Sequence, residues 1–380
     1  MEEQSTYPIR VLDHTLILPP LRQALHDESL DLIDWHCTQL QGGTTGGVYR
    51  VAGRALTHAH TAPWSLILKS PSQEISLGDP YGGEREPVIY RSGALPTQSH
   101  GLCAPRCFGV AQQAPGGHWI WLEDVHEDGP QQWPIARYSL AAQHLGTFGG
   151  TFLAGAARPP WPWVGSETML PKYVERFLPA FDQLRLALDH WQTHYALSAQ
   201  LCARMLELYA ERDWLCAALT QLPQTICHGD ADRRNFLSRR TADGDTATVA
   251  IDWAFAGVGV VGQDISRMVS NAVGFGQIEP AKLGALEAPV FASYLSGLQA
   301  AGWHGEQRLV RLGYTASTAV AECLVVMGTV LVMLADERNH TFMERIIGAP
   351  IAAIIPRIAP LLNYQLALAD EAHTLWDELT

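Results

Sequence analysis

Three oxygen-bearing side chains close together in the sequence could support phosphoryl transfer. Asp230 and Asn235 lie in the stretch HGDADRRN at 228–235, and Asp252 follows Asn235 by seventeen residues. Phosphoryl transfer needs a carboxylate near the attacking hydroxyl and oxygen ligands that hold Mg²⁺ against the nucleotide phosphates. Asp230 is the candidate for the first task, and Asn235 and Asp252 are the candidates for the second. The alternative is a polar hairpin that holds these residues without a catalytic role.

The same residues resemble the aminoglycoside phosphotransferase and choline kinase-like family, the small-molecule relatives of protein kinases. The resemblance consists of His-Gly-Asp at 228–230, four residues and then Asn235, and Ile-Asp-Trp at 251–253. It implies that Asp230 is the catalytic base or orients the acceptor hydroxyl, and that Asn235 and Asp252 bind Mg²⁺. It also implies that His228 braces the loop.

Arginines in the same stretch have two interpretations. Arg233 or Arg234 could offset the negative charge of the transferring phosphoryl group. Alternatively, the two form a solvated pair that balances Asp232.

Features upstream agree in order with this resemblance. The glycine-rich turn at 42–47 contains Gly43 and Gly46, whose backbone N–H groups could contact nucleotide phosphates. Lys69 ends the apolar run LIL at 66–68 and resembles the lysine that binds the α- and β-phosphates. The alternatives are an ordinary hairpin turn and a surface lysine.

The glutamate partner of Lys69 is expected on the next helix, near 87–95. Glu84 and Glu86 are the candidates, and we favour Glu86. Because the residue before a proline is disfavoured in helical geometry, we expect Glu86 at the helix cap and Pro87 as the first helical residue.

The segment WIWLEDV at 119–125 resembles the strand that leads into the hinge of a kinase-like fold. Backbone groups of Glu123 and Val125 would then meet the purine edge of the nucleotide. The alternative is a buried strand that ends in two surface acids.

The interval after Asp252 is short. Asp264 follows it by twelve residues, without the Ala-Pro-Glu sequence of protein kinases. No regulated activation segment fits there, which favours a small-molecule acceptor over a peptide. Asp264 is expected at the start of the next helix as a structural support.

Composition excludes several classes of protein. The chain has 380 residues, 47% hydrophobic and 17% charged, with a net charge of −13, so disorder and general binding to nucleic acid or anionic membranes are disfavoured. A cationic or sugar-like acceptor would suit this charge and the faces of Trp133, Trp161, Trp163 or Trp303, although most of these rings are expected in the core.

Cysteine usage and the N-terminus favour a cytoplasmic location. The seven cysteines suggest reduced thiols, and the start MEEQS lacks the basic and apolar regions of a signal peptide. The apolar run at 323–335 is short for a membrane span and is expected to form a buried helix.

These observations together predict an α+β, bilobal protein kinase-like fold with the site between its lobes. Residues 1–125 would form a nucleotide-binding N-lobe of five antiparallel strands and one helix. Residues 126–380 would form a mainly helical C-lobe with the catalytic loop and the acceptor site, including helices at 138–153, 173–193 and 197–219. The expected reaction uses ATP or GTP and Mg²⁺ to phosphorylate a hydroxyl group of a small molecule. The alternatives are an inactive nucleotide-binding module and a protein kinase.

Overall fold

The computed structural model of the chain describes residues 12–40, 46–58, 60–71, 82–97, 101–113, 117–164 and 169–379. The chain divides into two compact units. The first comprises Met1–Ser99, Cys103–Glu127 and Val249–Ala254, and the second comprises His100–Leu102, Asp128–Thr248 and Phe255–Thr380.

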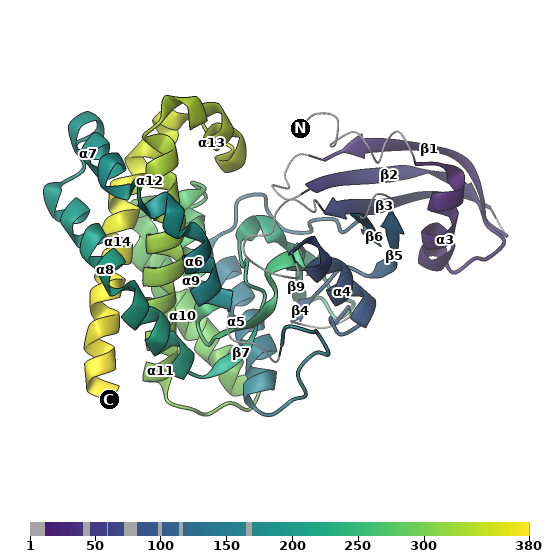
Figure 1. Ribbon diagram of the computed structural model, residues 1–380. Helices are drawn as coiled ribbons and strands as arrows, with labels where there is room; N and C mark the ends of the chain where they lie inside the picture. The colour runs from purple at the N-terminus through teal and green to yellow at the C-terminus, as the bar shows by residue number, and fades with distance from the viewer. Residues whose placement is uncertain are drawn as a thin grey trace. The chain divides into compact units, whose positions relative to one another are not determined.

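The first unit is built on an antiparallel sheet of five strands in the order β1-β2-β3-β6-β5 (Figure 1). Its strands are β1 (Asp31–Gln39), β2 (Gly46–Leu56), β3 (Thr61–Pro71), β5 (Cys107–Gln113) and β6 (Gly117–Glu123). Along β3 the buried residues Trp64, Leu66 and Leu68 alternate and share one face with the core. Since side chains alternate along a strand, Lys69 lies on the opposite face.

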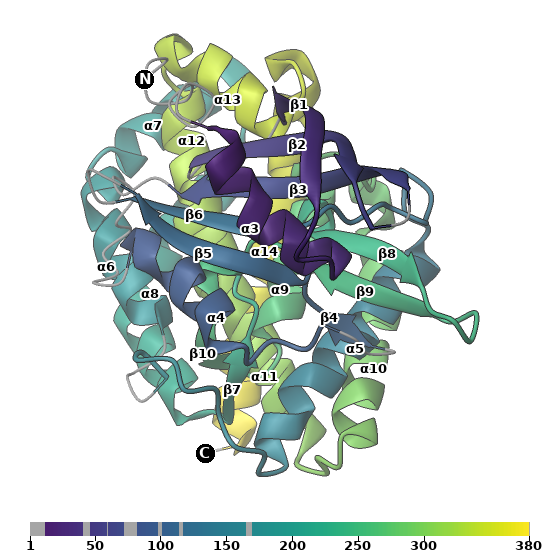
Figure 2. The same ribbon diagram turned by 90° about the vertical axis from the view of Figure 1, so that its right-hand side faces the viewer.

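Helix α3 (His14–Leu25) packs against this sheet, with Ile17 and Leu21 fully buried in the core cluster (Figure 2). This helix was not predicted from the sequence, and it contains Pro19 and Pro20, a residue type that is disfavoured inside helices. Asp13 caps its N-terminus by accepting hydrogen bonds from the backbone of Thr15 and Leu16. Burial of the apolar face offsets the cost of the two prolines.

The helix that follows the sheet's third strand starts earlier than expected. It consists of a 3-10 turn, η1 (Gly82–Glu84), and α4 (Arg85–Ser92), and it ends at Gly93 with φ of 63°. Glu86 therefore lies in the first turn, and the predicted cap position is wrong. Pro87 is tolerated because the first N–H groups of a helix have no intrahelical partner.

The second unit is mainly helical. Its helices are α5 (Ile135–Leu153), α6 (Met169–Phe181), α7 (Leu184–Tyr195), α8 (Ala199–Gln221), α9 (Gln263–Gly274), α10 (Leu283–Ala300), α11 (Gln307–Ser317), the π-helical η5 (Thr318–Met327), α12 (Gly328–Leu334), α13 (His340–Ile347) and α14 (Ile351–Leu379). Short 3-10 turns are η2 (Arg233–Asn235), η3 (Trp253–Phe255), η4 (Pro280–Lys282) and η6 (Glu337–Asn339). The single helix expected at 173–193 is two helices, α6 and α7, separated by a turn at 182–183.

Two small sheets position the loop at 228–235, called here the polar loop. β7 (Gln224–Cys227) pairs antiparallel with β10 (Gly257–Val260), and β4 (Leu102–Cys103), β8 (Phe236–Arg240) and β9 (Thr246–Ala250) form a sheet in the order β4-β9-β8. β8 and β9 are neighbours in this sheet and are joined by the turn at 241–245. Residues 228–235 thus run between two short strands.

Helices α5 and α10 lie side by side (Figure 2) because glycines allow their backbones to approach closely. A Cβ atom on Gly146 would meet the backbone of Tyr294, and one on Gly297 would meet the backbone of Gln143. Helix α5 also packs against β7, the strand that precedes the loop at 228–235.

Two helical segments are long and apolar enough to cross a membrane by length and composition. They are Gln307–Leu334, with 72% of its most apolar window buried in the protein, and Ile351–Leu379, with 39% buried. The first contains residues 323–334 of the run at 323–335, whose expected burial in a helix is confirmed for Cys323, Leu324 and Leu331. The 72% burial of Gln307–Leu334 is typical of a core helix.

Candidate active site

The loop after β7 is fixed by a buried carboxylate on α9. Asp264 accepts hydrogen bonds from the backbone N–H groups of His228 and Gly229, each at 2.9 Å. His228 is fully buried, and its Nδ1 accepts the N–H of Asp230 at 3.2 Å. Burial raises the pKa of Asp264. The His228 side chain and the two backbone N–H donors act in the opposite direction and lower it. The structural roles expected for Asp264 and His228 are therefore present in the contacts.

Gly229 is required at its position for two reasons. Its φ of 80° is in the left-handed region, and a Cβ atom there would overlap the backbone oxygen of Phe255. Only glycine meets both conditions without strain. The backbone consequently turns sharply just before Asp230.

Both carboxylate oxygens of Asp230 have partners. Asn235 Nδ2 donates to Oδ2 at 2.9 Å and to the backbone oxygen of Asp230 at 3.0 Å. Arg267 Nε donates to Oδ1 at 2.6 Å. The carboxylate is thereby held in one orientation, which is the geometry that a residue positioning a substrate hydroxyl requires.

The sequence analysis did not identify Arg267, which belongs to α9. Its Nη1 lies 3.2 Å from Oε1 of Glu322 in η5, and the hydroxyl of Tyr173 in α6 also contacts it. Arg267 follows Asp264 by three residues, so the two share one face of the helix. This spacing was the signal in the sequence that could have indicated Arg267 as a site residue. A second signal was Glu322, a single acid inside an apolar helix.

A pocket of about 50 Å³ adjoins this group of charges. It is lined by Leu170, Tyr173, Gly229, Phe255, Gln263, Arg267, Ala321 and Glu322. Its walls thus combine aromatic and aliphatic surface with an arginine and a glutamate, beside the loop at 228–235.

The arginines of the loop are engaged elsewhere. Arg234 pairs with Asp232 at 3.1 Å and lies over the Phe275 ring, and Arg233 lies over the Trp133 ring at 4.4 Å. The arginine that pairs with Asp230 is Arg267, at 2.6 Å.

A second cluster lies in the first unit, around Lys69. Its Nζ is 2.6 Å from Glu86 Oε2 and 2.7 Å from Asp252 Oδ1, and Glu86 Oε1 accepts the backbone N–H of Trp253. The side chains of Lys69 and Glu86 are 11% and 2% exposed. Asp252 has a φ of 61°, a conformation that costs energy in a residue other than glycine and is often found at functional sites.

Charge in this cluster is unbalanced. Burial alone would lower the pKa of Lys69, but Asp252 and Glu86 raise it above its ordinary value, so the ammonium stays charged. Burial raises the pKa of Glu86, and Lys69 opposes that shift. Two carboxylates facing one ammonium leave excess negative charge, which a bound cation would offset.

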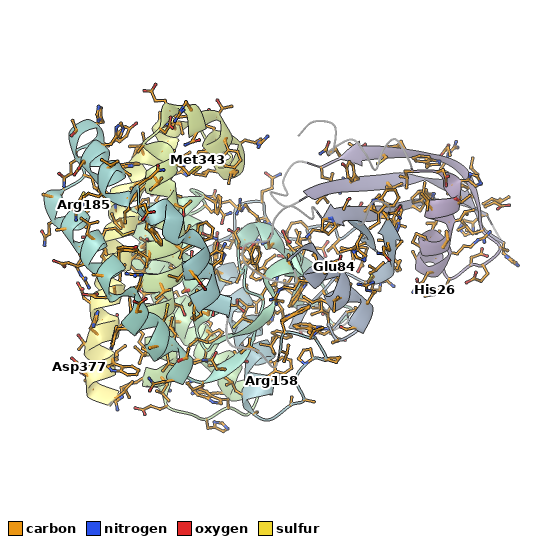
Figure 3. The ribbon with its side chains drawn as sticks, viewed as in Figure 1. His26, Glu84, Arg158, Arg185, Met343 and Asp377 are labelled. Carbon is orange, nitrogen blue, oxygen red and sulfur yellow. The ribbon has the colours of Figure 1, made fainter. Side chains whose placement is uncertain are left out.

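Glu84 has different partners from Glu86. It lies in η1 (Figure 3), 3.0 Å from His118 and 3.8 Å from Arg91. The structure therefore pairs Lys69 with Glu86, as favoured from the sequence.

The segment after β6 is anchored by a residue to which the sequence analysis gave no role. Asp124 accepts hydrogen bonds from Arg50 Nε at 2.7 Å and from the hydroxyl of Ser65. Glu123 ends β6, and its carboxylate accepts the backbone N–H of Arg106 at 3.1 Å. Asp124 thus fixes the backbone between Glu123 and Val125.

The other predicted residues have simpler environments. Gly43 lies outside the described residues, and Gly46 starts β2 opposite Pro71. Trp133, Trp161 and Trp163 are each 3% exposed and belong to the core. Each of the seven cysteines, all within the described residues, is a free thiol.

The predicted site residues thus form two groups. Lys69, Glu86 and Asp252 meet in the first unit, and Asp230 and Asn235 meet in the second. Between Asp252 and α9 the described chain contains only η3, β10 and their connections, which leaves no room for an activation segment.

Residues 105–304, more than half of the chain, match the family described as "Phosphotransferase enzyme family". The chain belongs to this family. It is a phosphotransferase, and the predicted family is confirmed. The predicted fold class is also confirmed, with its five-stranded antiparallel sheet and a larger, mainly helical unit.

Several solved structures resemble this chain at low identity. Amicoumacin kinase hAmiN, in complex with AMP-PNP, Ca²⁺ and Ami, has 15% identity and a TM-score of 0.48 over 94% of both chains. A thermostable mutant of aminoglycoside phosphotransferase APH(4)-Ia, with ADP and hygromycin B, has 14% identity and a TM-score of 0.44 over 88% of this chain and 94% of that one. The GDP complex of aminoglycoside 2'-phosphotransferase-IIIa has 13% identity and a TM-score of 0.43 over 94% and 99%. No curated protein sequence matches the chain.

Proposed function

We propose that this phosphotransferase moves the γ-phosphoryl group of ATP or GTP to a hydroxyl group of a small molecule. The hydroxyl oxygen forms a bond to the γ-phosphorus, and the bond from that phosphorus to the β,γ-bridging oxygen breaks. The electron pair leaves with the nucleoside diphosphate, and the hydroxyl proton passes to Asp230 and then to solvent. The observation that carries this proposal is the Asp230 carboxylate, held on both oxygens in a loop of the phosphotransferase family.

Asn235 and Asp252 are proposed as ligands of Mg²⁺, and the chemistry of both residues fits that cation. Asn235 donates both of its described amide hydrogen bonds to Asp230, which leaves its amide oxygen as the acceptor. Asp252 accepts a hydrogen bond from Lys69 on Oδ1, and it belongs to the cluster with excess negative charge. When bound, Mg²⁺ neutralises charge on the phosphates, and one carboxylate and one amide suffice because phosphate oxygens complete its shell.

The nucleotide is proposed to bind at the first unit. Lys69, held by Glu86, would contact the α- and β-phosphates, and backbone groups of Gly43 and Gly46 would contact phosphate oxygens. Backbone groups of Glu123 and Val125 would receive the base, on a segment that Asp124 anchors. The buried Lys69–Glu86 pair is preformed, so little reorganisation is required on binding.

The acceptor is proposed to bind at the pocket beside Arg267. Gly229, next to Asp230, lines this pocket, so a hydroxyl group there would lie near the carboxylate. The net charge of −13 and the presence of Glu322 support a cationic or neutral, sugar-like acceptor over an anion, and over nucleic acid.

The test is release of nucleoside diphosphate in the presence of Mg²⁺. Purified protein is incubated with ATP or GTP and with a panel of aminoglycosides, macrolides, choline analogues, amino sugars and sugars. We expect at least one acceptor to raise the rate above the rate without acceptor, and EDTA to abolish it. Nucleotide binding without turnover under every condition would contradict the proposal and indicate an inactive module, and phosphate incorporated into peptides would indicate a protein kinase.

A further inference from the structure

We propose that Arg267 is a positioning residue for the reaction, which orients the Asp230 carboxylate, and that Glu322 holds Arg267 in place for this task. The inference rests on the proposed function and adds to it a residue that the sequence motifs do not contain. It concerns contacts within the second unit only.

The first step is the fixed orientation of Asp230. Arg267, in α9, donates to Oδ1 at 2.6 Å. Asn235, at the end of the loop at 228–235, donates to Oδ2 at 2.9 Å. Rotation of the carboxylate would break both hydrogen bonds. A carboxylate has about four lone-pair positions, so acceptance of these two donors leaves room for a substrate hydroxyl.

The second step is the anchoring of Arg267 itself. Glu322 is 2% exposed, its Oε1 accepts from Arg267 Nη1 at 3.2 Å, and its Oε2 has no hydrogen-bond partner among the described residues. If Arg267 turned away, a buried carboxylate would lose its only described cationic partner, which is costly. Burial raises the pKa of Glu322, and the charge of Arg267 is the main opposing influence.

The third step is the local backbone that presents Glu322. The residue lies in η5, a π-helical segment between α11 and α12, and π-turns inside helices are frequently found at functional sites. The same segment supplies Ala321 and Glu322 to the pocket wall. An irregular turn is therefore maintained at the place where the acidic partner of Arg267 is needed.

The fourth step is the location of Arg267 at the pocket. Its side chain is 21% exposed and lines the pocket together with Tyr173, Gly229 and Glu322. A hydroxyl group that reaches Asp230 from this pocket passes the guanidinium. Orientation of Asp230 by Arg267 should consequently affect turnover more than nucleotide affinity.

The experiment compares Arg267→Gln, Arg267→Lys and Glu322→Gln with a matched control, Arg311→Gln. Arg311 is 24% exposed and, like Arg267, bridges two carboxylates of the second unit, Glu287 and Glu371, but it does not line the pocket. The probe reaction is Mg²⁺-dependent ATP hydrolysis with water as the acceptor, and, where the panel yields an acceptor, transfer to that compound. Affinity for ATP is measured with a fluorescent ATP analogue, and stability by thermal unfolding.

We expect Arg267→Gln to lower kcat by roughly 100-fold and Arg267→Lys by about 10-fold, since misplacement of a reacting group by about 1 Å can have such an effect. Glu322→Gln should lower kcat by about 10-fold by the same argument. The KM for ATP should change by less than about 3-fold in all three, because their contacts are on the acceptor side. Arg311→Gln should lower the melting temperature without lowering kcat.

Two results would overturn the proposal. If Arg267→Gln kept the kcat of Arg311→Gln, Arg267 would be an ordinary structural ion pair and the proposed function would stand. If the wild-type protein turned over no nucleotide with any acceptor, the proposed function and this inference would both be wrong. Should Arg267→Gln fail to fold, Arg267→Lys decides, since it keeps the charge and loses only the geometry of the guanidinium.

Discussion

Lys69 donates a 2.7 Å hydrogen bond to Asp252, a residue 183 positions further along the chain. The same ammonium group pairs with Glu86, so a single buried cation holds two carboxylates. The strand β3, the helix α4 and the segment at Val249–Ala254 are joined through it. This relationship makes Lys69 important for the stability of the first unit, and the proposed function assigns it a second role in nucleotide binding.

Replacement of Lys69 should therefore have two effects. Lys69→Met leaves the buried Glu86 and the partly exposed Asp252 without their cation. We expect the free energy of unfolding to fall by about 3 kcal/mol. The affinity for ATP should fall by at least about 10-fold through loss of the phosphate contact. Urea unfolding and titration with a fluorescent ATP analogue measure the two effects.

A control for this variant is Lys282→Met, which removes an ammonium that is 59% exposed and pairs with Glu279 on the surface. It should change stability by less than about 1 kcal/mol. Unaltered ATP affinity in Lys69→Met, in folded protein, would exclude Lys69 from the nucleotide site.

Gly229 provides a test of the loop geometry, with Gly244 as its match. Both have a positive φ, of 80° and 89°, so alanine pays a conformational cost of about 1–2 kcal/mol at either position. Only at Gly229 would the added Cβ meet the backbone of Phe255, since nothing lies within 4 Å at Gly244. Gly229→Ala should lower kcat by more than about 10-fold, and Gly244→Ala should leave kcat unchanged.

The measurements are nucleoside diphosphate release and urea unfolding of both variants. Equal kcat values for the two would show that the close contact with Phe255 does not govern the orientation of Asp230.

Much of the fold could be predicted from local patterns. The five strands of the sheet and most helices follow from alternation and helical periodicity, which are local properties. Helix α3 was not predicted. It contains Pro19 and Pro20, and tertiary burial of Ile17 and Leu21, which a local pattern does not show, stabilises it together with the Asp13 cap. The break between α6 and α7 at 182–183 was also not visible in the apolar spacing.

Some residues of the candidate site could likewise be predicted from local sequence, and others could not. Asp230, Asn235 and Asp252 could be predicted as site residues because they lie close together in the sequence and their types and spacing form a motif. Arg267 was not, since it lies 37 residues from Asp230, and its contact depends on how α9 packs under the loop. Glu322 is 55 residues from Arg267, and its role depends on a π-helical turn that no residue pattern indicated.

Stability of the second unit should depend on pH through His144. This residue of α5 is 7% exposed, and its Nδ1 lies 2.9 Å from the hydroxyl of Thr248. Burial, with a smaller effect from the charge of Arg137, lowers the pKa of His144 from 6.5 to about 4. Between these two values the unfolded chain binds a proton that the folded chain does not, so stability falls as the pH falls from 6.5 to 4.

The expected loss over this range is about 3 kcal/mol from His144, and it is regained above pH 6.5. Urea unfolding at pH 7 and pH 5 should show about 2 kcal/mol of this loss, because the folded-state pKa of about 4 lies below pH 5. His144→Gln should reduce the difference between the two pH values, whereas His304→Gln, at an exposed imidazole, should not. A difference that is as large in His144→Gln as in the wild type would assign the pH dependence to other groups.

The central claim is that the Asp230 carboxylate directs the acceptor hydroxyl, and one pair of measurements on Asp230→Ala tests it most directly. Single-turnover formation of ADP from ATP, Mg²⁺ and an acceptor that the panel identifies gives the rate of phosphoryl transfer. Titration with a fluorescent ATP analogue gives nucleotide affinity. We predict a rate lower by about 1,000-fold, with affinity within about 2-fold of the wild type, because Asp230 acts in the transition state and not in nucleotide binding. A rate equal to that of the wild type would contradict the account.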